Sequence, residues 1–217
     1  MRTKLDQMLE AMNVALVDMG RMCQEAISCA IQGMLSGDED MTQKVFIMER
    51  ALDEKEREVE RLCMELLLRQ QPVAKDLRIV SVALKMIRDM ERIGDQAADI
   101  AEISRHIEND NLFGRLHVQE MAQATIKMVT DSINSFVRRD VEAARKVVAD
   151  DDKVDGLFLE VRRDLVAALA ENSAVGESCI DILMIAKYLE RIGDHATNIA
   201  EWVEYSVTGV HVGESVE

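Results

Sequence analysis

The sequence predicts an all-α protein made of two similar three-helix bundles in tandem, and three observations support this fold class. Proline occurs once and glycine ten times in 217 residues, so few residues favour turns or helix ends. Aromatic residues make up 3% of the chain, whereas a sheet protein of this size would need many aromatic or β-branched residues. Residues 91–102 read ERIGDQAADIAE and residues 190–201 read ERIGDHATNIAE. This repeat, at an offset of 99 residues, indicates an internal duplication.

The first helix is expected over residues 5–35, where apolar side chains recur at helical spacing. Gly37 can adopt the left-handed conformation that ends a helix, and Asp38 follows as a candidate N-cap of the second helix. Charges of both signs over residues 53–58 are typical of an exposed helix face. The second helix is expected to end near Gln70.

The third helix is predicted to open at Pro72, because proline is tolerated in the first turn, and to end near His106. Polar residues 108–111 form the clearest break, and Asp140 is a second candidate N-cap. The expected helices of the second half are 112–137, 140–170 and 177–206. The predicted units are a first repeat at 1–108, a second repeat at 112–208 and a flexible tail at 209–217.

Composition limits the possible classes of function. A formal net charge of −15 argues against nucleic-acid binding, which depends on a basic face. No apolar run approaches the roughly 20 residues of a membrane-spanning helix and no signal peptide is visible, so we expect a cytoplasmic protein without direct membrane insertion. The cysteines form no CxxC pair and are typical of thiols in a reducing compartment; they are Cys23, Cys29, Cys63 and Cys179.

The duplicated segment carries acidic residues that share one helix face. Helical residues advance by about 100° each, so Glu91 and Asp95 lie nearly in line. Glu190 and Asp194 repeat this arrangement in the second half. Gly94 lies beside these acids and would let another backbone or a ligand approach closely.

A second pair of acids lies on the preceding helix of each half. These pairs are Glu49 with Asp53 and Asp151 with Asp155. In an antiparallel helix pair, residues equally far from the turn come level, and the two pairs in each half match to within about 3 Å. Converging carboxylates repel one another, and a hard cation relieves the repulsion. The predicted metal ligands are Glu49, Asp53, Glu91, Asp95, Asp151, Asp155, Glu190 and Asp194. The predicted cofactor is a divalent or trivalent metal ion such as iron, Mn, Mg or Zn.

Other interpretations of these acids remain open. They can form a solvated helix face with ordinary ion pairs to neighbouring arginines. They can also belong to a metal-storage protein or metal-dependent enzyme, but such bundles need Glu-x-x-His motifs, and no histidine follows a Glu at that spacing. Glu56 and Glu60 are a further pair four residues apart, competing with Glu49 and Asp53. Asn198 replaces one acid of the first-half stripe. No catalytic motif is present, so the chain is predicted not to be an enzyme.

Residues 69–78 read RQQPVAKDLR, and with the twofold ERIGD they resemble the PhoU family of regulators of phosphate-specific transport. The resemblance extends over nearly the whole chain, including its division into halves. Residues 150–155 also resemble the acidic segment of a family repeat. The resemblance to the family implies two similar three-helix bundles. It also implies metal sites built from E/DxxxD motifs, and the eight acids named above match these motifs.

The resemblance also implies a function. Family members are negative regulators of the phosphate-starvation response and restrain phosphate uptake. They link a phosphate ABC transporter, through its ATPase, to a sensor histidine kinase, and they often form homodimers. Free phosphate is expected to be a poor direct ligand for a chain with a net charge of −15.

Overall fold

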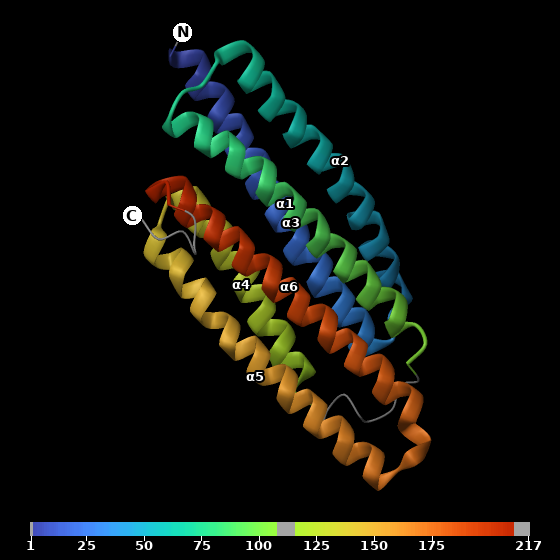
Figure 1. Cartoon of the computed structure of the whole chain (residues 1–217). Helices are drawn as coiled ribbons and strands as arrows, with labels where there is room; N and C mark the ends of the chain where they lie inside the picture. The colour runs from blue at the N-terminus through green and yellow to red at the C-terminus, as the bar shows by residue number, and fades with distance from the viewer. Residues whose placement is uncertain (1, 108–115, 211–217) are drawn as a thin grey trace.

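The computed structural model describes residues 2–107 and 116–210, and within them the chain forms six long α-helices (Figure 1). These are α1 (Arg2–Ser36), α2 (Glu39–Gln70), α3 (Lys75–Ser104), α4 (Val118–Arg138), α5 (Val141–Glu171) and α6 (Gly176–Thr208). A short 3-10 helix, η2 (Ser173–Val175), connects α5 to α6. The described residues contain no strand, so the predicted all-α class is confirmed.

The six helices form a layered bundle in which the two halves pack side by side (Figure 1). Helices α1 and α3 of the first half contact α4 and α6 of the second, while α2 covers α1 and α3 and α5 covers α4 and α6. The buried apolar side chains form one core that is continuous across both halves. Each half is therefore a three-helix unit, but the two units stabilise each other through a shared core. None of the described helices is long and apolar enough to cross a bilayer.

The helix ends follow the local sequence at the first turn of each half. Gly37 has a positive φ of 67°, and the Asp38 side chain accepts a hydrogen bond from the backbone N of Asp40 at 2.9 Å. The Asp140 side chain accepts from the backbone N of Ala143 at 3.0 Å. Both predicted N-caps are confirmed, and each satisfies an otherwise unpaired N–H at the start of a helix.

The prediction that Pro72 opens the third helix is wrong. Helix α3 begins at Lys75, and Pro72 lies in the turn before it. Gln71 and Ala74 flank the turn with positive φ values of 46° each. A positive φ at Ala74 is incompatible with a right-handed helix, so helical geometry starts only after this residue. The same helix ends at Ser104, two residues earlier than predicted.

Two expected segment boundaries fall outside the described residues. The predicted start of the fourth helix at residue 112 is one, and the helix is described from Val118 onward. Residues 211–217 of the predicted tail are the other. Helix α6 ends at Thr208 and is followed by Gly209, whose φ of 79° gives a left-handed C-cap.

Candidate metal centre

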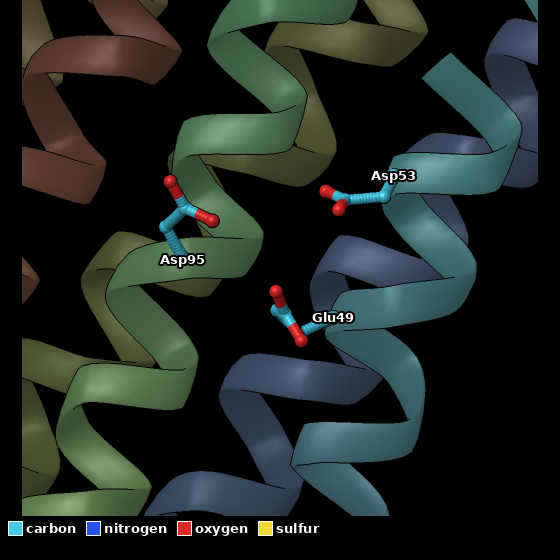
Figure 2. A group of neighbouring side chains, drawn as sticks. All are labelled: Glu49, Asp53 and Asp95. Carbon is cyan, nitrogen blue, oxygen red and sulfur yellow. The ribbon is translucent and has the colours of Figure 1, made fainter. Parts of the chain in front are cut away.

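Three carboxylates meet between α2 and α3. One oxygen each from Glu49, Asp53 and Asp95 lies within 4.8 Å of the others. Figure 2 shows Glu49 and Asp53 projecting from α2 toward Asp95 on α3. All three residues are partly buried. Within residues 2–107 and 116–210, no other group of three His, Cys, Asp or Glu side chains meets at this distance. We call these three residues the first acidic cluster.

A glycine allows the two helices to come this close. A Cβ placed on Gly94 would lie 2.6 Å from Cδ1 of Leu52, which is buried on α2. Gly94 directly precedes Asp95, and Leu52 directly precedes Asp53. The close approach expected at Gly94 is thus made by helix α2, and it brings the carboxylates of the two helices together.

The electrostatics of the first acidic cluster favour a cation. Burial raises the pKa of Glu49, the charges of Asp53 and Asp95 raise it further, and Arg50 partly opposes them. A carboxyl group that holds its proton because of neighbouring carboxylates is stabilised in its charged form when a cation binds. Oxygen-only ligands are those that hard ions such as Mg²⁺, Mn²⁺ and Ca²⁺ prefer.

Glu91 lies one helical turn before Asp95 and is not among the three clustered carboxylates. Burial raises its pKa, and Asp95 adds to the effect, whereas Arg92 opposes it. Arg92 Nη1 lies 2.9 Å from Asp95 Oδ2, and its Nε lies 3.5 Å from Glu91 Oε2. Glu91 is therefore joined to the cluster through a shared arginine.

The competing pair on α2 lies outside the cluster. Glu56 and Glu60 are absent from the group within 4.8 Å, and Glu60 is exposed. Glu56 contributes instead to the raised pKa of Glu91. The spacing of the acids did not decide which of the two pairs on α2 belongs to the site. In the structure, the rotation of α2 about its axis turns Glu49 and Asp53 toward Asp95.

The second half contains a looser version of the cluster, between α5 and α6. Burial raises the pKa of Asp151, with further contributions from the charges of Asp155 and Asp194. Asp155 and Asp194 are exposed. A Cβ on Gly193 would lie 3.4 Å from Asp151 Oδ1, an ordinary contact distance. We call Asp151, Asp155 and Asp194 the second acidic cluster.

Glu190, the fourth predicted ligand of the second half, is paired with a neighbour on its own helix. Its carboxylate accepts a hydrogen bond from Nζ of Lys187, three residues earlier. The Lys187 ammonium also lies over the Phe158 ring of α5, 5.6 Å from the ring centre. Glu190 thus resembles Glu91 in lying beside its cluster with a cation as partner.

A polar network between the two halves was missed by the sequence analysis. Asp89 Oδ1 on α3 accepts a hydrogen bond from Asn198 Nδ2 at 3.2 Å and lies 2.9 Å from His195 Nδ1 on α6. At the equivalent place, a hydrogen bond from Tyr188 lowers the pKa of Asp99, which burial raises. The 99-residue offset relates Asp89 to Tyr188 and Asp99 to Asn198. The sequence gives one signal for these contacts: the offset of 99 residues identifies equivalent positions in the two repeats, and here residues at these positions contact each other between the halves.

This network explains why Asn198 stands where the first half has an acid. Its side chain donates to Asp89 across the boundary between the halves. His195 is likewise engaged with Asp89, as expected of a packing histidine. The described acidic clusters therefore contain carboxylates without histidine, unlike the Glu-x-x-His sites of di-iron bundles.

The fold and the site define a duplicated helical bundle with a cluster of carboxylates in each repeat. A model of the PhoU domain matches this chain twice, over residues 16–104 and 118–203. The first match spans α1 to α3 and the second spans α4 to α6. The chain therefore belongs to the PhoU family.

Similar proteins agree over nearly the full length. The chain is 31% identical to a phosphate-specific transport system accessory protein PhoU homolog of Clostridium acetobutylicum, covering 94% of each protein. It is 31% identical to the accessory protein PhoU of Escherichia coli strain K12, covering 94% of the chain and 87% of that protein. These relatives are named for an accessory role in transport and not for a catalysed reaction, in agreement with the prediction that the chain is not an enzyme.

Solved structures of the family have the same fold. The crystal structure of PhoU from Pseudomonas aeruginosa superposes with a TM-score of 0.88 at 30% identity, covering 94% of this chain and 99% of that one. A phosphate transport system regulatory protein PhoU from Streptococcus pneumoniae superposes with a TM-score of 0.87 at 22% identity. The predicted pair of similar three-helix bundles is confirmed.

Proposed function

We propose that this chain is a negative regulator of the phosphate-starvation response and of phosphate uptake. It acts as an adaptor between a phosphate ABC transporter, contacted at its ATPase, and a sensor histidine kinase. The observation that carries the proposal is the family match over both repeats, with relatives named as accessory proteins of phosphate-specific transport. In this role, abundant phosphate keeps the kinase pathway silent.

The physical character of the chain suits an adaptor. Long helices packed on one continuous core give a rigid body with extended side faces. The net charge of −15 favours partners with basic surfaces and speeds their encounter at low salt. Catalysis is not needed for this role, because the regulator works by occupying a partner's surface.

We further propose that the acidic clusters bind metal ions. The first cluster uses Glu49, Asp53 and Asp95, and Glu91 joins them when Arg92 is displaced. The second cluster uses Asp151, Asp155 and Asp194 in the same way, with Glu190 beside them. The bound ion neutralises the carboxylates and fixes α2 against α3 and α5 against α6, so metal binding stiffens the outer helices on which partners dock.

The proposed location is the cytoplasm. All four cysteines are free thiols, which is typical of proteins in a reducing compartment; they are Cys23, Cys29, Cys63 and Cys179. The proposed assembly is a homodimer, as the resemblance implies. Contact with the membrane is made through the transporter and the kinase.

The proposal is tested by deleting the gene in its own host and measuring alkaline phosphatase activity in phosphate-rich medium. We expect high phosphatase activity in the deletion strain and its repression when the gene is restored. Unchanged phosphatase activity after deletion would contradict the regulatory role. Pull-down of the transporter ATPase and the kinase by the purified chain then tests the adaptor role, which fails if neither is retained.

A further inference from the structure

A cavity between α4 and α5 has an unusual charge for this acidic chain. It has a volume of about 140 Å³ and is lined by Ala124, Lys127, Met128, Lys146, Asp150 and Lys153. Three of these six side chains are ammonium groups and one is a carboxylate. The local charge is therefore opposite in sign to the net charge of −15.

The cavity and the second acidic cluster use side chains that leave α5 in different directions. Asp150 and Asp151 are consecutive on α5, so their side chains point about 100° apart. Asp150 Oδ2 accepts from Lys127 Nζ of α4 at 3.0 Å, whereas Asp151 faces Asp194 of α6. The cavity and the cluster are separate features.

Two of the three lysines are available to a ligand. Lys127 is engaged by Asp150 at 3.0 Å and by Asp131 at 2.5 Å. Lys146 and Lys153 form no ion pair with any residue of the described ranges. Part of the cavity wall is Met128, which is only 2% exposed, and an apolar surface of this kind strengthens the attraction between an ammonium group and an anion.

We propose that this cavity binds a phosphate group, held by Lys146 and Lys153. Lysine ammonium groups bind phosphate oxygens as point charges and need no fixed bidentate geometry. The volume of about 140 Å³ is enough for a tetrahedral oxyanion with some hydration. The phosphate group is either free orthophosphate or the terminal phosphoryl group of a nucleotide whose base lies outside the cavity.

The equivalent place in the first half lacks two of the charged residues that line the cavity. The offset of 102 residues that relates Asp151 to Glu49 places Lys44, Met48 and Ala51 at the positions of Lys146, Asp150 and Lys153. The first half thus retains one of the α5 lysines only. The proposed cavity therefore has no equivalent at this place in the first half, and Lys44 provides a control outside it.

This inference does not depend on the proposed regulatory role, because it is argued from local charge and volume alone. It differs from the expectation, drawn from the net charge, that free phosphate is a poor direct ligand. The relevant charge for a bound oxyanion is that within a few ångströms, since solvent and salt screen the distant carboxylates.

Isothermal titration calorimetry tests the proposal: orthophosphate is titrated into the full-length, chelator-treated protein. Chelation excludes phosphate bridged by a metal. We expect saturable binding of one phosphate per chain and an affinity at least ten-fold weaker in the double variant Lys146→Gln with Lys153→Gln. The control variant Lys44→Gln with Lys75→Gln removes the same charge and is expected to bind as the wild type does.

A parallel titration with ADP and ATP distinguishes the two sources. Nucleotide binding that requires Lys146 and Lys153, without orthophosphate binding, would assign the site to a phosphoryl group on a larger molecule. Absence of saturable binding by all three compounds would overturn the proposal, as would equal losses in the cavity and control variants. Neither negative result would affect the phosphatase measurement that tests the regulatory role.

Discussion

Gly94 of α3 lies directly against Leu52 of α2, with space for a hydrogen but not for a methyl group. A Cβ on Gly94 would come within 2.6 Å of Leu52 Cδ1. At the equivalent Gly193 of α6, the nearest side-chain atom is Asp151 Oδ1 at 3.4 Å. The same glycine of the repeated ERIGD segment is therefore under a tighter steric limit in the first half.

This difference predicts opposite effects of two matched substitutions. Gly94→Ala should reduce the free energy of unfolding by up to about 2 kcal/mol, because overpacking of a buried contact by roughly 1–3 kcal/mol outweighs the roughly 1 kcal/mol that alanine gains in a helix. Gly193→Ala should be neutral or stabilising by up to about 1 kcal/mol, because alanine favours the helix and finds room. Urea denaturation of both variants measures this. Equal effects at the two glycines would show that the close contact at Leu52 has no energetic importance.

The raised pKa of Glu49 predicts a pH-dependent stability of the metal-free protein. Because burial and the charges of Asp53 and Asp95 raise this pKa above its ordinary 4.5, the folded state binds more protons than the unfolded chain in the interval above 4.5. Stability therefore falls as pH rises through that interval and stays lower above it. Glu49→Gln should stabilise the metal-free protein at pH 7 and lose this advantage at pH values below 4.5.

The control for this effect is Glu54→Gln, which removes an exposed carboxylate from the same helix. It reports the general benefit of reducing the negative charge of the chain. Urea unfolding curves between pH 4 and pH 8, roughly spanning the ordinary range of carboxyl titration, provide the comparison. A stabilisation by Glu54→Gln as large as that by Glu49→Gln would assign the effect to net charge rather than to the cluster.

Arg92 is predicted to compete with a metal ion for the first acidic cluster. Its guanidinium holds Asp95 at 2.9 Å and Glu91 at 3.5 Å, so a cation must displace or compete with it. Ion pairs exposed to this degree contribute about 0.2–1 kcal/mol, which corresponds to a factor of roughly 1.5 to 5 in affinity. Arg92→Gln should strengthen Mn²⁺ binding by about this factor.

The measurement is a Mn²⁺ titration in a background of Asp155→Asn with Asp194→Asn, which leaves the first acidic cluster intact. Arg191→Gln is the matched control, because Arg191 is the equivalent arginine of the second half and its guanidinium lies over the Tyr188 ring, 6.0 Å from the ring centre. It changes the net charge by the same amount. If Arg92→Gln binds Mn²⁺ no more tightly than Arg191→Gln, Arg92 does not compete for the site.

Asp89 is predicted to hold the two halves together. Asp89→Ala removes the partner of both His195 and Asn198 at the α3–α6 contact and should cost about 1–3 kcal/mol of stability. Asp18→Ala removes an exposed aspartate whose partner is Arg21 at 3.5 Å, and should change stability by less than about 0.5 kcal/mol. Thermal unfolding separates these values, and similar shifts for both would contradict a role for Asp89 between the halves.

Much of the fold was predictable because its determinants are local. Apolar spacing specified the helices, and Asp38 and Asp140 marked two helix starts. The turn at Pro72 was mispredicted because the positive φ of Ala74 is imposed by the chain geometry between two packed helices, and alanine gives no local signal for it. The contact between the halves was also unpredictable, since Gly20 of α1 meets Ile133 of α4 only after both helices have folded.

For the candidate site, the sequence predicted the level of the acidic residues along the helix axes. It did not predict how each helix is rotated about its axis. Spacing from the turns placed Glu49, Asp53 and Asp95 at one level. Whether Glu91 or Asp95 faces α2 depends on packing at Gly94 and Leu52, which no single helix encodes. In each half, helix packing decides which of the four acids converge. Their role as metal ligands stays a prediction.

The most direct test of the metal centre is the metal content of the protein purified without chelator or affinity tag. Plasma mass spectrometry would compare the wild type with a folded variant carrying Glu49→Gln, Asp53→Asn and Asp95→Asn. We predict near-stoichiometric metal in the wild type and its loss from the first acidic cluster in the variant. A wild-type protein without metal, even after incubation with Mn²⁺, Fe²⁺ or Mg²⁺, would contradict the account and return these carboxylates to the role of a solvated helix face.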